Sequence, residues 1–230
     1  VLDFGAEHVV LATGCRWRRD GYGRSNGFAI AGFADSARVY TPDDLMDGRL
    51  PEGRVVVFDD DGFYYASVAA EMLRAHGCDV TYVTPDDSIA PWSLNTLDYR
   101  HIRKRMAKLG IEPVVSHNIT GFDGSTLTLE DVWNGQRREL ACDAVVTVTA
   151  RVPDDALHHE LRQRESAWSE AGIRTLRCIG DAEAPGLIAH AIYAGHRYAR
   201  ELEESESGDV PFKRHFHTAH ATDLLRDPAA

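Results

Sequence analysis

The sequence predicts an α/β fold of two domains with parallel sheets, in which the second domain is inserted into the first. Two strand-and-turn segments of the same construction stand near opposite ends of the chain, at residues 8–14 and 176–181. Between them, residues 53–84 have the pattern of a strand, a helix and a second strand. A unit of this kind and length forms a right-handed crossover between two parallel strands, so each domain is expected to contain a parallel sheet.

The order of the segments gives the domain boundaries. We assign residues 1–37 and 149–210 to the first domain, residues 38–148 to the second, and residues 211–230 to a C-terminal tail. The chain has no initiator methionine and opens almost directly in the strand at 8–11. We therefore expect the first domain to be truncated at its N-terminus and the sequence to be part of a longer polypeptide.

Composition and charge limit the classes of function. With 230 residues, of which 43% are apolar, the chain is large enough to bury a core. Its net charge is −11, without the basic block that a nucleic-acid groove needs, so we expect neither nucleic acid nor a membrane as a partner. The sequence contains neither an apolar run long enough to span a bilayer nor a signal peptide. We therefore expect the protein to be located in the cytoplasm. The four cysteines lie far apart, so we predict no metal centre and no disulfide framework.

The first candidate site is the turn that follows the apolar strand at 176–179. Gly180 lets a ligand approach the backbone closely, and Asp181 can accept hydrogen bonds from a ligand hydroxyl. A helical pattern begins at Pro185, and a helix N-terminus attracts anions through its unpaired N–H groups and its dipole. An anionic ligand is therefore expected here. Helix capping by Asp181 is the competing interpretation.

Thr13-Gly14 repeats this construction after the strand at 8–11. Arg16, Trp17 and two further arginines follow in what we expect to be a loop. Arginines beside a tryptophan can clamp a phosphate and stack on a ring, although a solvated basic loop is the simpler interpretation. Residues 20–52 are rich in Gly, Asp and Pro and predict an irregular connection, with a short helix at 41–46 that Thr41 caps.

The strand, helix, strand unit lacks the feature that would bind a dinucleotide. Its strands are expected at 54–58 and 79–83, and its helix at 64–76. A dinucleotide-binding unit has glycines in its first turn, so that backbone amides contact the pyrophosphate. Here the turn is Asp59-Asp60-Asp61-Gly62-Phe63-Tyr64-Tyr65. Its carboxylates would repel a pyrophosphate and its aromatic rings would block one, so we predict that no NAD(P) binds.

The rest of the chain continues the α/β pattern. An Asn134-Gly135 pair lies between alternating segments and is a strong hairpin signal. The other expected elements are a basic amphipathic helix at 94–109, a strand beginning at 111, antiparallel strands within 119–132 and 137–141, a buried strand at 144–149, and a surface helix or helix plus loop at 154–171.

Taken together, the motifs resemble a known family. A-T-G after a strand, a second strand-helix-strand domain, a hairpin, and G-D before a long helix resemble the flavoproteins with two dinucleotide-binding domains, such as glutathione reductase. A narrower set resembles the C-terminal third of the trimethylamine, dimethylamine and histamine dehydrogenases over about residues 8–205. That set comprises Ala12 to Trp17, the non-glycine turn with Phe63-Tyr64, Arg164 to Trp168, Ile179 to Pro185, and Gly195-His196-Arg197.

The resemblance implies an iron–sulfur flavoprotein. In this family an N-terminal TIM barrel, which this chain does not include, carries FMN and a 4Fe-4S cluster and oxidises an amine. Electrons then pass to an electron-transferring flavoprotein. The C-terminal third binds ADP in its FAD-like domain, contains no catalytic residue and uses no pyridine nucleotide. The implied partners are the barrel, the electron-transferring flavoprotein and a second copy in a homodimer. The residues that would flank the nucleotide are Thr13, Gly14, Gly180 and Asp181, with Arg16 and Trp17 as further candidates.

Two other functions stay open. The first is a fragment of an NAD(P)H-dependent enoate or 2,4-dienoyl-CoA reductase, which would need glycines at 59–64. The second is a non-catalytic module that binds ADP or docks a partner. The amine is also open among histamine, dimethylamine and trimethylamine, because the substrate pocket lies elsewhere. His215, His217 and His220 have a spacing that suits a metal, but we interpret them as a surface tail.

Overall fold

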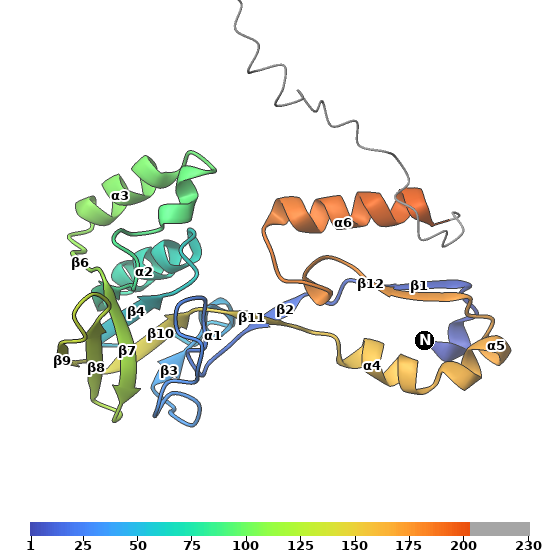
Figure 1. Ribbon diagram of the computed structural model, residues 1–230, viewed down its shortest axis with the longest axis horizontal. Helices are drawn as coiled ribbons and strands as arrows, with labels where there is room; N and C mark the ends of the chain where they lie inside the picture. The colour runs from blue at the N-terminus through green and yellow to red at the C-terminus, as the bar shows by residue number, and fades with distance from the viewer. Residues whose placement is uncertain (203–230) are drawn as a thin grey trace, which may run out of the picture.

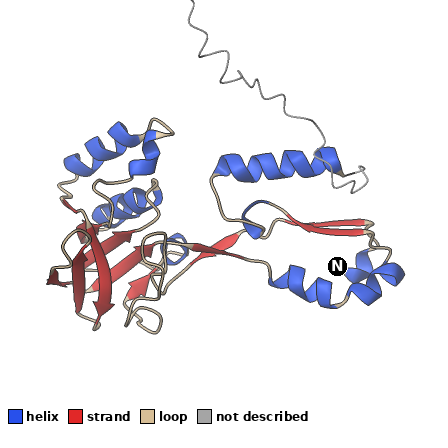
Figure 2. Ribbon diagram, viewed as in Figure 1, coloured by secondary structure: helices blue, strands red, loops and turns tan. Residues whose placement is uncertain are grey.

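The computed structural model describes residues 1–202 and has an α/β architecture of two bodies (Figure 1). The first, which we call the central body, contains the elements from β3 to β10. The second, the terminal body, is built from the two ends of the described chain. Figure 2 shows that a narrow pair of strands joins the two bodies. The histidines at 215, 217 and 220 and the tail at 211–230 lie outside the described residues.

The central body is organised around a five-stranded parallel sheet of order β3-β10-β4-β5-β6. Every residue of β10 is buried, as predicted for the apolar run at 144–149. The strand, helix, strand prediction is also confirmed, because β4 and β5 are parallel and α2 lies between them in the chain. The bounds of the strands are Val39–Tyr40 (β3), Arg54–Asp59 (β4), Asp79–Val83 (β5), Pro113–Val114 (β6) and Ala144–Val148 (β10).

Two layers cover this sheet. One face packs on helices, with Leu73 and Met106 in the shared core. The other face packs on a three-stranded antiparallel sheet through Ile119, Leu127 and Leu129. The bounds of the helices are Pro42–Met46 (α1), Tyr65–Ala75 (α2) and Tyr99–Lys108 (α3), with a 3-10 turn at Pro91–Leu94 (η2). Those of the antiparallel strands are His117–Phe122 (β7), Thr126–Asp131 (β8) and Arg137–Ala141 (β9).

The terminal body is smaller. Strand β1 (His8–Leu11) pairs in parallel with β12 (Thr175–Cys178), in the register His8↔Thr175 to Leu11↔Cys178. One face of this pair packs on α4 and α5 in a core of six buried apolar side chains. Helix α6 (Ile188–Glu201) lies over the other face (Figure 1). The remaining helical elements are Leu2–Phe4 (η1), Ala156–Gln163 (α4), Glu165–Ala167 (η3), Trp168–Ala171 (α5) and Gly180–Ala182 (η4).

Two sides of the terminal body are exposed among the described residues. Within the described residues, none of the side chains of α6 is buried, and Ile188, Ile192 and Tyr193 are 67%, 57% and 64% exposed. Also within residues 1–202, β1 pairs only with β12. Parallel strands are normally buried on both faces in larger sheets. The exposed side of α6 and the free edge of β1 therefore form a surface that suits further packing.

The junction of the two bodies corrects the sequence analysis. Arg16 and Trp17 were expected in a loop, but they lie in strand β2 (Cys15–Trp17), which pairs antiparallel with β11 (Arg151–Pro153). Helix α6 was expected to begin at Pro185, but it begins at Ile188 after an extended segment. The basic helix begins at Tyr99 rather than at 94, because residues 91–94 form the 3-10 turn η2.

Other local predictions are confirmed. Thr41 caps α1 in a capping box with Asp44, and the turn between β8 and β9 contains Asn134-Gly135 with Gly135 at φ +70°. The helices formed by residues 1–202 are all too short or too polar to cross a membrane. Among these same residues, no group of three or more His, Cys, Asp or Glu side chains is placed to hold a metal ion.

Candidate functional site

The two predicted turns lie side by side at one end of the terminal body. Leu11 and Cys178 are register partners at the carboxyl ends of β1 and β12, and the N–H of Ile179 donates to the carbonyl of Leu11 at 3.0 Å. Thr13-Gly14 and Gly180-Asp181 therefore leave the sheet at the same edge. Ligands of α/β proteins bind at the carboxyl ends of parallel strands, so this edge is the candidate site.

Both glycines at this edge have backbones that favour glycine. Gly14 has φ +84° and Gly180 has φ +61°, in the left-handed region that residues with a Cβ adopt at a cost. A Cβ on Gly14 would meet no described atom within 4 Å. The backbone at Gly14 is therefore open to an approaching ligand, which fits a turn that presents N–H groups to a phosphate.

Asp181 does not cap a helix, so the capping interpretation is wrong. The N-cap of α6 is Leu187, and that of the short turn η4 is Ile179. Instead, Oδ1 of Asp181 accepts a hydrogen bond from the N–H of Gly186 at 3.0 Å, and Oδ2 lies 3.6 Å from Nη1 of Arg151. The carboxylate thus links the beginning of the 180–186 loop to its end. With 27% of its side chain exposed, it still faces solvent in part.

Cys15 also contacts this carboxylate. Its Sγ donates to Oδ2 of Asp181 at 3.4 Å. Burial, followed by the nearby Asp181, raises the pKa of the Cys15 thiol to about 11. At neutral pH the thiol therefore stays protonated, which is the form that donates the hydrogen bond.

Thr13 and Arg16 lie at the outer side of this edge and contact Asp154. The hydroxyl of Thr13 donates to the carbonyl of Asp154, and the N–H of Asp154 donates to the carbonyl of Gly14 at 2.9 Å. Nη2 of Arg16 lies 3.4 Å from the Asp154 carboxylate, with 76% of the Arg16 side chain exposed. Arg16 is thus close to the candidate turns, and the ion pair of its side chain with Asp154 is exposed to solvent and contributes little stability.

Trp17 faces the central body rather than the candidate turns. Its ring packs edge to face on Tyr65 at the start of α2, with 5.2 Å between the ring centroids. The guanidinium of Arg151 lies 5.1 Å from the Trp17 ring and 5.3 Å from the Tyr65 ring. Trp17 is therefore engaged in the junction, and the structure does not bring it together with the other predicted residues as a stacking surface.

Arg151 is the residue that the sequence analysis missed. Its side chain is only 10% exposed, and Nη1 donates to the carbonyl of Gly186 at 3.0 Å. The available signal was a single arginine directly after the buried strand at 144–149, in a segment with no pattern of its own. Because its partners come from β2, α2 and the 180–186 loop, only the tertiary structure reveals its position.

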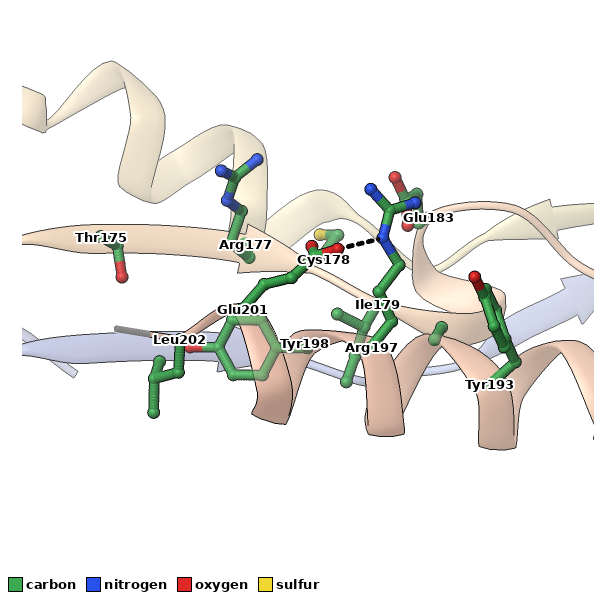
Figure 3. A pocket seen from close by; sticks show the side chains of 11 residues that line it. Thr175, Arg177, Cys178, Ile179, Glu183, Tyr193, Arg197, Tyr198, Glu201 and Leu202 are labelled. Carbon is green, nitrogen blue, oxygen red and sulfur yellow. Dashed lines mark hydrogen bonds and ion pairs between the residues drawn. The ribbon is translucent and has the colours of Figure 1, made fainter. Parts of the chain in front are cut away.

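A cleft adjoins the candidate turns. It has a volume of about 390 Å³ and lies between β12 and α6. Figure 3 shows Arg177 from the strand and Arg197 from the helix at this cleft, together with the carboxylates of Glu183 and Glu201. Nε of Arg197 donates to Oε1 of Glu201 at 2.8 Å. The cleft therefore places positive and negative groups next to the Gly180 turn.

The carboxylate turn of the central body is filled by the chain itself. The side chains of Asp59 and Asp60 are both fully buried. Asp60 accepts hydrogen bonds from the N–H groups of Ser25 at 2.9 Å and Asn26 at 3.1 Å. Asp59 accepts from the N–H of Gly62 at 2.9 Å and from the hydroxyl of Tyr82. Carboxylates and the 23–26 loop thus occupy the carboxyl end of β4, where a dinucleotide-binding unit presents backbone N–H groups.

Burial changes the titration of this turn. Desolvation raises the pKa of Asp59 to about 7, although the hydrogen bond from Tyr82 and the backbone amides act in the opposite direction. Burial also raises the pKa of Asp61. The turn therefore holds acidic groups that are costly to ionise.

Comparison with known proteins identifies relatives of this chain. The chain matches the OYE-like second alpha/beta domain over residues 40–154. It is 31% identical to dimethylamine dehydrogenase from Hyphomicrobium sp. (strain x), covering 93% of this chain and 32% of that protein. Among solved structures, histamine dehydrogenase from Rhizobium sp. 4-9 is similar with a TM-score of 0.89 and 40% identity over 94% of this chain and 32% of that one.

A further similar structure is that of an amine oxidase. The structure of 6-hydroxypseudooxynicotine amine oxidase from Pseudomonas geniculata N1 is similar with a TM-score of 0.79 and 40% identity, over 84% of this chain and 29% of that one. The fold alone is shared with thioredoxin reductase from T. acidophilum, at 16% identity and a TM-score of 0.58, over 86% of this chain and 65% of that one. The parallel sheets therefore resemble those of thioredoxin reductase-like FAD- and NAD-binding domains in fold.

The chain spans about a third of the length of the amine dehydrogenases that it matches. The family match covers half of the chain and most of the central body. The chain thus belongs to the family of OYE-like second alpha/beta domains, and it is homologous to the C-terminal region of the dimethylamine and histamine dehydrogenases.

Proposed function

We propose that this chain is the C-terminal nucleotide-domain part of an iron–sulfur flavoprotein amine dehydrogenase, and that its terminal body binds ADP. One observation carries the proposal: the Thr13-Gly14 and Gly180-Asp181 turns, which stand far apart in the sequence, meet at the carboxyl edge of β1 and β12. The homology to proteins named for dimethylamine and histamine supports the activity of the whole polypeptide.

The residues at this edge fit a nucleoside diphosphate. The open backbone at Gly14 and the left-handed turn at Gly180 would present N–H groups to the phosphates. The partly exposed carboxylate of Asp181 would accept from a ribose hydroxyl. Arg16 lies close enough to this edge to add positive charge.

The two bodies have different proposed roles. The terminal body would be a partial FAD-like domain, and the central body an NAD(P)-like domain inserted into it that serves structure rather than pyridine-nucleotide binding. The buried carboxylates of Asp59 and Asp60 support this role, because a pyrophosphate at that turn would face negative charge in a desolvated place.

The chemistry is proposed to lie outside this chain. An N-terminal barrel with FMN and a 4Fe-4S cluster would oxidise a small amine, such as histamine, dimethylamine or trimethylamine, and a second copy of the polypeptide would complete a homodimer. Electrons would pass to an electron-transferring flavoprotein. The exposed side of α6 and the free edge of β1 suit packing against the rest of the polypeptide.

ADP binding can be tested with two matched glycine variants. Gly14 and Gly5 both have positive φ, of +84° and +75°, and a Cβ on either would meet no described atom within 4 Å. Only Gly14 lies at the proposed site. We expect Gly14→Val in the full natural polypeptide to weaken ADP binding at least tenfold by calorimetry, because the side chain would project into the open space. Gly5→Val should leave the affinity unchanged.

The same titrations distinguish the alternatives. If the two variants lose equal affinity, the turn at Gly14 is not the nucleotide site. NADPH is expected to give no heat and no protection of the central body. Saturable NADPH binding that Asp59→Asn strengthens would instead favour the reductase. A purified polypeptide without flavin or cluster absorbance, but with bound ADP, would favour the non-catalytic module.

A further inference from the structure

Arg151 links the proposed nucleotide site to the central body. We propose that Arg151 is the positioning residue of the 180–187 loop, and that it sets the conformation in which this loop receives the nucleotide. The inference rests on the proposed function for the ligand, but its structural part concerns the loop alone. Arg151 comes from β11, next to the point where the chain crosses between the two bodies.

The contacts of Arg151 with the loop form a closed ring. Nη1 of Arg151 donates to the carbonyl of Gly186 at 3.0 Å, and the N–H of Gly186 donates to Oδ1 of Asp181 at 3.0 Å. The ring closes where Oδ2 of Asp181 lies 3.6 Å from Nη1 of Arg151. Both polar groups of the Gly186 backbone are therefore engaged, directly before the N-cap of α6 at Leu187.

The other side of the guanidinium packs on aromatic rings of the junction. Trp17 comes from β2 and Tyr65 from α2, and Arg151 lies within 5.3 Å of both ring centroids. Tyr65 is itself stacked on Tyr64, with centroids 4.4 Å apart. A planar guanidinium can lie against rings while its edge donates in a fixed fork, whereas an ammonium is a compact point charge without that shape. The site therefore suits arginine better than lysine.

These contacts couple the loop to the central body. A movement of Asp181 would break its hydrogen bond with Gly186 or draw the Arg151 guanidinium away from the rings of Trp17 and Tyr65. A nucleotide that binds the loop in this conformation would in turn stabilise the stack, since coupling between two sites is reciprocal. This coupling would preorganise the loop. Because the loop is ordered before the ligand arrives, less conformational entropy is lost on binding.

The test uses three arginine variants in the full natural polypeptide. Arg151→Met keeps the apolar stem but removes the hydrogen bond, the ion pair and the cation. Arg151→Lys keeps the stem and the charge but loses the planar guanidinium. The control, Arg174→Met, makes the same change in the terminal body, where Nη1 of Arg174 lies 3.3 Å from Glu7 and 69% of its side chain is exposed. Each variant is examined by amide exchange over residues 180–190, by near-UV circular dichroism and by ADP calorimetry.

For Arg151→Met we expect amide exchange at Gly186 and Leu187 to rise at least tenfold, a change in the aromatic dichroism, and ADP affinity lower by tenfold or more. Arg151→Lys should regain less than half of the ADP affinity that Arg151→Met loses, measured as the logarithm of Kd. Arg174→Met should match the wild type in all three measurements. The readouts at the loop distinguish positioning from a global loss of stability, which would raise exchange throughout α4 and α5 as well.

The possible failures are distinguishable. If Arg151→Met exchanges and binds ADP as the wild type does, Arg151 does not position the loop. If lysine restores both fully, the need for a planar guanidinium is overturned. If the wild type binds no ADP but the loop of Arg151→Met still exchanges faster, the proposed function fails while the positioning of the loop is supported. If neither ADP binding nor the exchange difference is seen, both are overturned.

Discussion

Replacing Asp59 with asparagine should remove most of the pH dependence of stability between about pH 4 and pH 7. The pKa of this carboxyl is raised from 3.8 to about 7, chiefly by desolvation. Between these values the unfolded chain ionises the group and the folded chain does not. The folded state therefore binds more protons, and stability falls as the pH rises through this window. Asp59 contributes no penalty below pH 3.8, and its full penalty is present above pH 7.

The expected effect is large because the side chain is fully buried. Each pKa unit corresponds to about 1.4 kcal/mol, so the wild type should lose roughly a few kcal/mol between pH 4 and pH 8. Asparagine would keep an oxygen for the amides of Asp61 and Gly62, which now bond to Oδ1 of Asp59. We therefore expect the Asp59→Asn variant to be more stable than the wild type at pH 8 and to show a flatter profile.

Urea unfolding at pH 5, 6, 7 and 8 measures this difference. Asp143→Asn is the control, since the hydrogen bonds from Arg54 lower the pKa of Asp143 to about 2 and the group does not titrate in this range. Tyr82→Phe should act in the opposite direction to Asp59→Asn, because it removes the buried hydroxyl that donates to Asp59. Parallel profiles for the wild type and Asp59→Asn would show that Asp59 does not control the pH dependence.

The second large effect is expected for Gly32→Ala. Gly32 has φ +83°, and a Cβ at this position would lie 1.8 Å from the carbonyl oxygen of Phe122. The contact is between two stretches of backbone, since the N–H of Phe122 also donates to the carbonyl of Ala31 at 2.9 Å. The alanine variant must therefore separate the 30–33 segment from β7, where Phe33 packs edge to face on Phe122.

Gly48→Ala is the matched control for Gly32→Ala. Gly48 has φ +81°, but a Cβ there would meet no described atom within 4 Å. The control should cost about 1–2 kcal/mol for the left-handed backbone alone. Gly32→Ala should cost about 1–3 kcal/mol more for the enforced displacement. Equal urea midpoints for the two variants would contradict the close approach of the two backbones.

Local patterns were sufficient to predict most of the central body. The apolar run at 144–149 and the helical spacing of 64–76 each correspond to an observed element, because both are buried along a continuous face. Thr41 and Asn134-Gly135 were predictive because a capping box and a tight turn depend on a few adjacent residues. These features need little information from the rest of the chain.

The junction was not predictable in this way. Strands β2 and β11 have three residues each, and their pairing joins segments far apart in the sequence. Helix α6 begins at Ile188 rather than at Pro185, because Asp181 and Arg151 engage the backbone of Gly186 just before the extended N-cap Leu187. In the candidate site, the two turns could be predicted to lie together because each follows a strand in the same way. The role of Arg151 could not be predicted, because its contacts with Trp17, Tyr65 and Gly186 exist only in the folded chain.

The β2 and β11 ladder has a consequence for modularity. The chain leaves the terminal body through Trp17 and returns through Arg151, and these two residues face each other as register partners. The segment from residue 18 to residue 150 therefore begins and ends at paired positions of the same two-stranded ladder. A two-residue turn is enough to close an antiparallel ladder of this kind into a hairpin. The central body is thus inserted into the terminal body at a single point, between two residues that face each other across one ladder.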